Sequence, residues 1–216
     1  MKRLHLLLAA ALFLAGCAAR EPRPNLTLLK WENIAWHDSG AYLDAFTRAS
    51  VHARQRAASW KSKRPPANAA VVFDIDETLL SNWPYLRSHN FAISEKAFTR
   101  WTRLENGIAL PPTREIFQAA RAAGLPIFLI TGRSASLRAE TIHDLKSAGY
   151  EGWSGLFMKP LSYTGESIIP FKSGTRKQLT EKGYDIILNM RDQDSDLAGG
   201  FARHHCKLPN PFYFIP

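Results

Sequence analysis

The sequence predicts a doubly wound α/β fold built on a parallel sheet. Two observations lead to this prediction: short apolar runs alternate with longer amphipathic segments, and the apolar runs contain almost no polar residues. Strands that are apolar on both faces are typical of a parallel sheet covered by helices on both sides. The chain has 216 residues, of which 45% are apolar and 22% charged, so one domain can bury a substantial core.

The predicted elements follow one another in a regular order. A loosely helical pattern over residues 41–60 stops before Pro65 and Pro66, and we expect this helix to pack outside the sheet. Residues 81–111 interrupt the alternation with five aromatic residues among polar ones, so we expect a cap insertion over the active face. The expected strands are residues 69–75, 125–130, 156–158 and 185–188, and the expected helices are a segment after Pro112, residues 134–148 and residues 173–182.

The N-terminus resembles a bacterial export signal. Lys2 and Arg3 precede an apolar run over residues 4–16, which would span roughly 20 Å as a helix, less than the roughly 30 Å hydrocarbon layer of a membrane. The run ends in Leu-Ala-Gly-Cys, which resembles the lipobox of bacterial lipoproteins. The resemblance implies that Cys17 is lipidated, and Ala18 after it implies the outer membrane. An ordinary secretory signal with a chance cysteine is the alternative.

This interpretation divides the chain into three parts. We expect residues 1–17 to be a lipoprotein signal peptide, residues 18–29 a tether and residues 30–216 the folded domain. Cys206 is then the second and last cysteine, which excludes a disulfide framework and favours a small buried hydrophobe.

The charge balance favours acidic partners without choosing among them. The 28 Lys and Arg residues exceed the 19 Asp and Glu residues, which gives a formal net charge of +9. The basic residues are scattered, and we interpret residues 61–64 as a solvated helix end rather than a nucleic-acid arm. No glycine-rich phosphate loop follows a predicted strand, which argues against dinucleotide and P-loop chemistry. Nucleic acid and small phosphate esters both fit this charge balance, so charge alone does not choose between them, but the scattered basic residues lead us to expect no nucleic acid polymer as partner.

Two carboxylates close the first predicted strand. Asp74 and Asp76 are two residues apart, so both side chains lie on the same side of an extended chain. Open α/β sheets bind ligands at the carboxyl ends of their strands. Two neighbouring acids repel each other and lose hydration there, so they need a cation or a proton nearby. We therefore interpret this pair as a functional site rather than as the polar end of a strand.

Four motifs in order resemble those of the haloacid dehalogenase-like (HAD) phosphatases. They are FDIDETLLSN at residues 73–82, ITGR at 130–133, FKSGTRKQLTEKGYDI at 171–186 and RDQDSDL at 191–197. With the terminal FARHHCKLPNPFYFIP, they are similar to the subfamily IIIB acid phosphatases, which include plant acid phosphatases, vegetative storage proteins and bacterial lipoprotein acid phosphatases. The resemblance implies a Rossmann-like HAD fold and an acid phosphatase that uses Mg²⁺ and hydrolyses small phosphomonoesters.

The resemblance also implies a role for each matching residue. Asp74 would be the nucleophile that becomes an aspartyl phosphate, and Asp76 would be the general acid and base. Thr131 would offer its hydroxyl to the phosphoryl oxygens, and Lys172 would offer them positive charge. The Mg²⁺ ligands would be Asp74, Asp76 through its backbone carbonyl, and Asp192, with Asp196 in support.

Three positions carry alternatives. Lys159 also follows an apolar run, but Lys172 leaves room for one helix and one strand before the fourth motif. His204 and His205 face opposite sides of an extended segment, so we expect one core and one surface histidine rather than a second metal site. The family carries Gly where this chain has Arg191, and the alternation of strand side chains predicts that Arg191 points away from the metal.

The function also has rivals. Trp83, Tyr85 and Trp101 in the insertion would stack on a nucleobase if they face the substrate, which makes a nucleoside monophosphate a candidate; as core residues they would not. A non-catalytic surface lipoprotein that binds or stores a ligand on the same scaffold is the main alternative. An enzyme that transfers phosphoryl groups to alcohols is another. The presence of Asp74 favours an enzyme.

Overall fold

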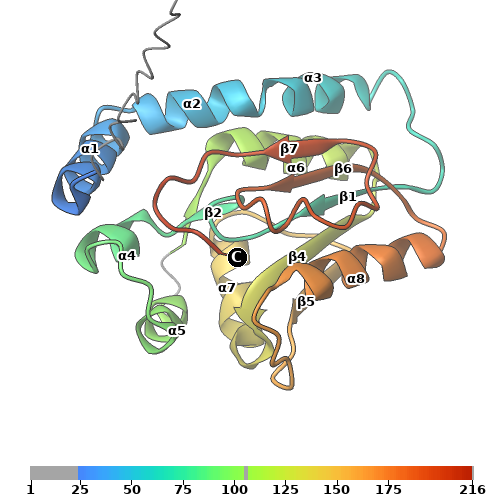
Figure 1. Ribbon diagram of the computed structural model, residues 1–216. Helices are drawn as coiled ribbons and strands as arrows, with labels where there is room; N and C mark the ends of the chain where they lie inside the picture. The colour runs from blue at the N-terminus through green and yellow to red at the C-terminus, as the bar shows by residue number, and fades with distance from the viewer. Residues whose placement is uncertain (1–23, 105–106, 216) are drawn as a thin grey trace, which may run out of the picture.

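A five-stranded parallel sheet forms the centre of the molecule in the computed structural model, which describes residues 24–104 and 107–215 (Figure 1). The strand order is β5-β4-β1-β6-β7, so the first strand lies in the middle and the chain winds outward in both directions. The strands are β1 (Ala69–Phe73), β4 (Ile127–Ser134), β5 (Gly155–Lys159), β6 (Asp185–Arg191) and β7 (His205–Lys207).

Helices cover both faces of this sheet. Along β1, Val71 and Phe73 pack into the larger core cluster, whereas Ala70 and Val72 pack into a smaller cluster with Leu179 of α8. The doubly wound prediction is therefore confirmed. The helices are α1 (Leu26–Asp38), α2 (Ala41–Ala49), α3 (Val51–Ser59), α6 (Pro111–Ala122), α7 (Arg138–Ser147) and α8 (Ile169–Glu181), with a short 3₁₀ turn η1 (Ala135–Leu137).

The expected insertion forms a small unit outside the main sheet. Its two short strands pair antiparallel and enclose two helices, as Figure 1 shows. Buried Trp83 and Tyr85 hold this unit against the core. The elements are β2 (Leu80–Ser81), α4 (Trp83–Ser88), α5 (Glu95–Arg103) and β3 (Ile108–Ala109).

The structure corrects the predicted N-terminal boundaries. The side chain of Asn25 accepts hydrogen bonds from two backbone N–H groups of the first turn of α1, so residues 26–29 of the expected tether are helical. The expected helix 41–60 is two helices that meet at Ser50. The Ser50 hydroxyl donates a hydrogen bond to the backbone carbonyl of Thr47.

Three later boundaries also move. β4 continues to Ser134 because its pairing with β5 resumes after an irregularity at Thr131. α8 begins at Ile169, four residues before the expected start, with Pro170 in its first turn. β7 was not predicted, since three residues of the sequence His-Cys-Lys carry no apolar run.

The edge strand β7 determines which way His204 and His205 face. Its buried side chain is Cys206, while His205 and Lys207 face outward and His204 lies exposed just before the strand. The prediction of one core histidine is therefore wrong, because the cysteine takes the inward position. Burial raises the pKa of the Cys206 thiol to about 11, as expected for a packing residue.

Among the described residues, the buried hydrophobic core runs from Tyr42 to Phe212. Within the described ranges, none of the helices combines the length and apolarity needed to cross a bilayer. The expected signal peptide, Cys17 and residues 18–23 lie outside the described residues.

Candidate active site

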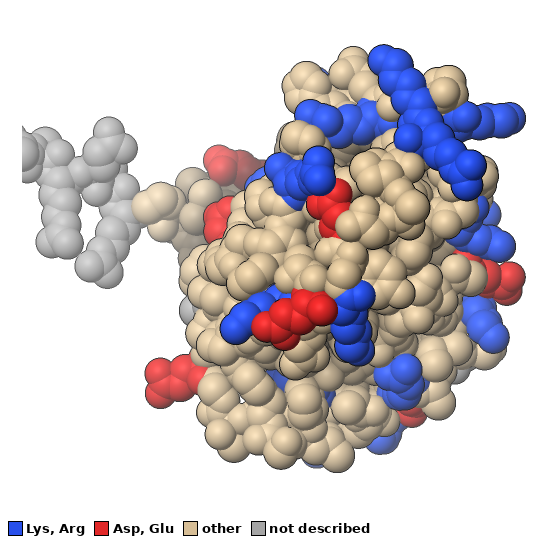
Figure 2. All heavy atoms as spheres, turned by 90° about the vertical axis from the view of Figure 1, so that its right-hand side faces the viewer, with Lys and Arg blue, Asp and Glu red and all other residues tan. Residues whose placement is uncertain are grey.

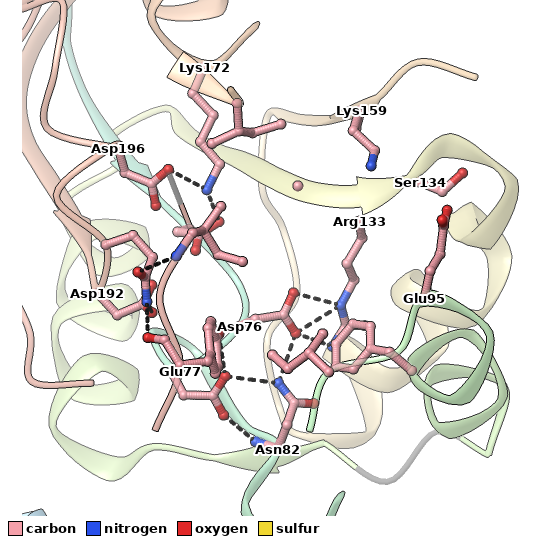
Figure 3. Close-up of a pocket in the computed structure, with 18 of the residues that line it drawn as sticks. Asp76, Glu77, Asn82, Glu95, Arg133, Ser134, Lys159, Lys172, Asp192 and Asp196 are labelled. Carbon is pink, nitrogen blue, oxygen red and sulfur yellow. Dashed lines mark hydrogen bonds and ion pairs between the residues drawn. The ribbon is translucent and has the colours of Figure 1, made fainter. Parts of the chain in front are cut away.

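A cavity of about 310 Å³ opens where the carboxyl ends of β1, β4 and β6 meet the insertion (Figure 3). Its closed end is strongly charged, and the insertion adds an apolar wall of Leu86, Ile93 and Phe98 together with the polar Asn82, Glu95 and Thr99. The charged lining residues are Asp74, Asp76, Glu77, Glu95, Arg133, Lys159, Glu166, Lys172, Asp192 and Asp196.

Asp74 lies at the buried end of this cavity. It follows β1 directly, and its backbone N–H still donates to the carbonyl of Met190 in β6 at 3.0 Å. Its carboxylate Oδ1 accepts a hydrogen bond from Lys172 Nζ at 2.9 Å, and the same ammonium lies 2.7 Å from Asp196 Oδ1. All three side chains are buried, so this is a charged cluster shielded from water.

The first turn of α8 brings Lys172 to this cluster. Burial alone lowers the pKa of Lys172, but the charges of Asp74 and Asp196 outweigh it, and the net shift is upward. Burial raises the pKa of Asp74, Lys172 lowers it, and the neighbouring Asp196 and Asp192 raise it further, so the net shift is upward as well. One lysine does not neutralise three buried carboxylates.

The three carboxylates have the geometry of a cation site. Ligand atoms of Asp74, Asp192 and Asp196 lie within 4.8 Å of one another. Asp196 Oδ2 is buried and has no hydrogen-bond partner among the described residues. Asp192 is oriented by Gln193 Nε2 and Asn210 Nδ2, which both donate to its Oδ2 at 2.7 Å. A set of carboxylate oxygens alone suits a hard divalent cation, so these residues fit a metal of that kind.

Asp76 belongs to a second, separately paired cluster. Arg133 Nε lies 3.0 and 3.1 Å from its two oxygens, and Arg133 Nη2 donates to Oδ1 at 2.8 Å. Asn82 Nδ2 adds a bond to Oδ1 at 2.9 Å. On the other side of the guanidinium, Arg133 Nη1 lies 3.1 Å from Asp144 Oδ2. Arg133 is thus held between two carboxylates, and it fixes the orientation of Asp76 toward the cavity.

Glu77 lies beneath this second cluster with a positive φ of 49°. Its carboxyl accepts hydrogen bonds from Tyr213 Oη at 2.6 Å and from the backbone N–H of Asn82 at 2.7 Å. Burial and the charge of Asp76 nevertheless raise the pKa of Glu77 to about 8. Tyr213 comes from the C-terminal segment, so this bond ties the end of the chain to the first motif.

The structure brings most of the predicted site residues together. The cavity described above is lined by five of them: Asp74, Asp76, Lys172, Asp192 and Asp196. Asp196, expected only in a supporting position, lies within the carboxylate triad itself, whereas the Asp76 side chain is outside that triad. Arg133, Glu77 and Asn82 were not among the predicted site residues. For Arg133, the signal was a charged residue that follows an apolar run in the ITGR motif.

Three residues singled out from the sequence, Thr131, Lys159 and Arg191, are not part of the carboxylate cluster at the closed end of the cavity. The Thr131 hydroxyl accepts a bond from the Arg133 backbone at 3.1 Å, and Gly132 rather than Thr131 lines the cavity. Lys159 lines the cavity but lies away from the carboxylate triad (Figure 3). Arg191 is buried and does not line this cavity, but it lines a small hollow together with Asp74 and Asp196, so the predicted direction of its side chain, away from the metal, stays a prediction.

The three aromatic candidates Trp83, Tyr85 and Trp101 of the insertion pack into or against the core and do not form a platform for the substrate. Trp83 stacks on His37, with ring centroids 3.7 Å apart, and Trp101 Nε1 donates to Asn82 at 3.0 Å. None of the candidates Trp83, Tyr85 and Trp101 is among the residues that line the cavity. The aromatic rings that do line it are those of Phe98, Tyr163 and Tyr213.

A family model confirms the resemblance. The model described as HAD superfamily, subfamily IIIB (Acid phosphatase) matches residues 32–216. The chain belongs to this family. The resemblance that the sequence motifs indicated is therefore confirmed over residues 32–216.

Curated relatives of this subfamily IIIB chain come from plants. Acid phosphatase 1 of Solanum lycopersicum is 35% identical over 148 residues, which cover 67% of this chain and 58% of that protein. Stem 28 kDa glycoprotein of Glycine max is 35% identical over 150 residues, with 67% and 59% covered. Vegetative storage protein 1 of Arabidopsis thaliana is 33% identical over 149 residues, with 67% and 55% covered. The matches thus span less than two thirds of these relatives.

Solved structures agree on the fold. The class C acid phosphatase from Bacillus anthracis has a TM-score of 0.70 and 19% identity, with 88% of this chain and 86% of that chain covered. The same enzyme with tungstate bound has a TM-score of 0.67 at 19% identity, with 87% and 86% covered. The predicted HAD-type fold is confirmed.

Proposed function

We propose that this protein is a Mg²⁺-dependent acid phosphatase that hydrolyses small phosphomonoesters through an aspartyl-phosphate intermediate. The observation that carries the proposal is the closed end of the cavity, where Asp74 faces Lys172 among two further carboxylates that leave room for a cation. Membership of subfamily IIIB supports the reaction class. Asp74, Asp192 and Asp196 would hold the ion, which when bound neutralises the acids and so admits a phosphate dianion.

In the first half-reaction, an oxygen of Asp74 attacks phosphorus. The new Asp74 O–P bond forms as the bond from phosphorus to the alcohol oxygen breaks. The Lys172 ammonium lies 2.9 Å from Asp74 Oδ1 and so stands beside the reacting phosphorus, where it stabilises the negative charge that develops on the phosphoryl oxygens. Asp76 delivers a proton to the leaving alkoxide, and Arg133 keeps its carboxyl oriented for that transfer.

In the second half-reaction, water attacks phosphorus and the Asp74 carboxylate leaves. Asp76 takes the proton of that water, which restores its protonated form and releases inorganic phosphate. Its Oδ2 suits this role because it accepts a single hydrogen bond from Arg133 Nε, whereas Oδ1 accepts three from Arg133 and Asn82. Oδ2 therefore keeps a lone pair for proton exchange.

The cavity favours a compact leaving group with one apolar side. Leu86, Ile93, Phe98 and Leu137 supply apolar wall, and the volume of about 310 Å³ suits a molecule the size of a nucleotide. A nucleoside monophosphate is therefore one candidate substrate. Its base would contact Phe98 or Tyr163 rather than the tryptophans of the insertion.

A turnover assay separates the enzyme from its rivals. Residues 18–216, which contain every residue that the structure describes, are assayed on aryl phosphate and on a nucleotide panel, with Mg²⁺ and with chelator. Release of phosphate that requires Mg²⁺ supports the proposal. Ligand binding without turnover supports the storage alternative, and a product that gains phosphate when an alcohol is added supports a transferase.

We further propose that the protein is a lipoprotein of the bacterial outer membrane. The support is the export-type N-terminus and the Leu-Ala-Gly-Cys ending at Cys17. Cys17→Ser should release the protein from the membrane fraction or block its processing, as immunoblots of cell fractions would record. Unchanged membrane retention after ordinary signal cleavage would contradict the proposal.

A further inference from the structure

A second hollow region, remote from the active site, lies between α3 and the edge strand β7. Three adjoining hollows of about 320, 210 and 280 Å³ share the side chain of Arg56 and form one groove. The groove and the active-site cavity have no lining residue in common. It runs along the β7 side of the sheet, whereas the active-site cavity opens at the carboxyl ends of the central strands.

The groove is lined by cationic and histidine side chains. Among its described lining residues there is no Asp or Glu. Figure 2 shows Lys and Arg side chains gathered at the upper end of the face on which α3 ends. The polar side chains that can meet an anion are His52, Arg56, Lys63, Arg203, His204, His205 and Lys207.

Part of this charge is not neutralised by the protein itself. Arg203 pairs with Asp185 at 2.7 Å, and Lys207 lies 3.7 Å from Asp194. Arg56 and Lys63 are exposed, and neither has an ion-pair partner in the part of the chain that the structure describes. Such unpaired cations around a hollow attract an external anion.

The floor of the groove is apolar. Buried Ala53 and Leu188 line one end, and buried Trp60 and half-buried Ile187 line the other. A cationic rim over an apolar floor suits an anion that carries hydrocarbon next to its charge. The headgroup region of an anionic phospholipid has this composition.

We propose that this groove binds the headgroups of anionic phospholipids and so docks the domain on a membrane surface. The lipid anchor proposed at Cys17 supports the choice of lipid, because residues 18–25 reach at most about 28 Å before α1 begins. The domain would then stay within reach of the bilayer. Contact through the groove leaves the active-site cavity away from the membrane, open to soluble substrates.

Vesicle binding without the anchor tests the groove separately from the lipoprotein proposal. Residues 18–216 are sedimented with vesicles of phosphatidylcholine alone and with vesicles that also contain phosphatidylglycerol. We expect binding only where phosphatidylglycerol is present. Equal binding to both vesicles, or binding to neither, would overturn the groove assignment without touching the phosphatase proposal.

Two double variants locate the contact. Arg56→Ala with Lys63→Ala removes two unpaired groove cations. Each of these two substitutions should weaken vesicle binding about fivefold. Lys96→Ala with Arg100→Ala removes the same charge from exposed positions on α5 and should change binding less than twofold. Both proteins should keep the turnover of the parent. Equal losses in the two variants would show general charge attraction, and the groove would have no special role.

A competition experiment distinguishes binding of lipid headgroups from binding of free phosphate. Inorganic phosphate is added to the phosphatidylglycerol vesicles and compared with chloride at the same ionic strength. We expect equal release by both salts. Release by phosphate well below the effective chloride concentration would show that the groove takes a soluble phosphate, which overturns the lipid assignment.

Discussion

The two carboxylates that end β1 lie in contrasting surroundings. Asp76 is paired within the protein, with the Arg133 guanidinium and the Asn82 amide, and only its Oδ2 keeps a lone pair for proton exchange. Asp74 shares the single ammonium of Lys172 with Asp196 and lies beside Asp192. One half of the site is therefore complete in the chain, and the other half carries excess negative charge that a divalent cation can neutralise.

This difference separates the roles of the two halves. The Asp76 half is a rigid, satisfied network, which suits a group that must hold one orientation through two proton transfers. The Asp74 half keeps its unmatched charge next to the substrate cavity, where it can attract a metal ion. The following substitutions each change one half of the site or a residue beside it, beginning with the largest expected effect.

Asp74→Asn should reduce kcat at least about a thousandfold, since an amide oxygen cannot form the aspartyl phosphate. The shape of the side chain is conserved, so the unfolding transition should remain cooperative. Steady-state kinetics on aryl phosphate with Mg²⁺ measure the loss, and circular dichroism checks the fold. Activity near that of the parent in a folded variant would eliminate Asp74 as nucleophile.

Lys172→Ala should lower kcat about a hundredfold or more, because the ammonium lies beside the reacting carboxylate in a buried site. Lys159→Ala is the matched control, since Lys159 lines the same cavity away from the carboxylate triad. We expect that control to stay within about threefold of the parent. The reverse order of effects would transfer the charge-stabilising role to Lys159.

Arg133→Ala should destabilise the fold by about 3–5 kcal/mol, because it leaves the buried Asp144 and the half-buried Asp76 without their shared, fully buried cation. Arg54→Ala removes an arginine from the exposed pair with Glu115 and should cost less than about 1 kcal/mol. Denaturant unfolding of both variants gives the comparison. Equal losses would mean that the Asp76 half is not a buried network in solution.

Glu77 predicts how stability depends on pH. Its pKa rises from 4.5 to about 8 on folding, so the unionised form favours the native state. Its contribution is complete below pH 4.5 and is lost as pH rises toward 8, with a slope of at most about 1.4 kcal/mol per pH unit. Glu77→Gln should flatten this dependence. A parent protein that gains stability from pH 5 to 8 through Glu77 would contradict the assignment.

Arg191→Gly should have the smallest effect. Arg191 lies outside the cavity, where burial and the neighbouring Arg176 lower its pKa to about 9. We expect kcat within about tenfold of the parent, equivalent to about 1.4 kcal/mol of barrier, and Mg²⁺ affinity equal or tighter. A Mg²⁺ titration of both proteins decides it. Collapse of kcat at saturating metal would mean that this arginine assists catalysis.

The sequence by itself determined the fold class and the positions of the reactive carboxylates. Apolar runs alternating with helical patterns predict a covered parallel sheet, and Asp74 and Asp76 follow the central strand at its ligand-binding end. Lys172 could also be assigned, because connection lengths are local in the sequence. These features depend on neighbouring residues along the chain, so a single sequence contains them.

Tertiary structure decided which side chains meet. Arg133 pairs with Asp76 across 57 residues, Tyr213 bonds Glu77 across 136, and the groove joins α3 to residues that follow β6. It also placed Cys206 inside and both histidines outside, and turned the tryptophans of the insertion into core residues. Such outcomes depend on how distant segments pack, and side-chain periodicity within one segment carries no information about its partner.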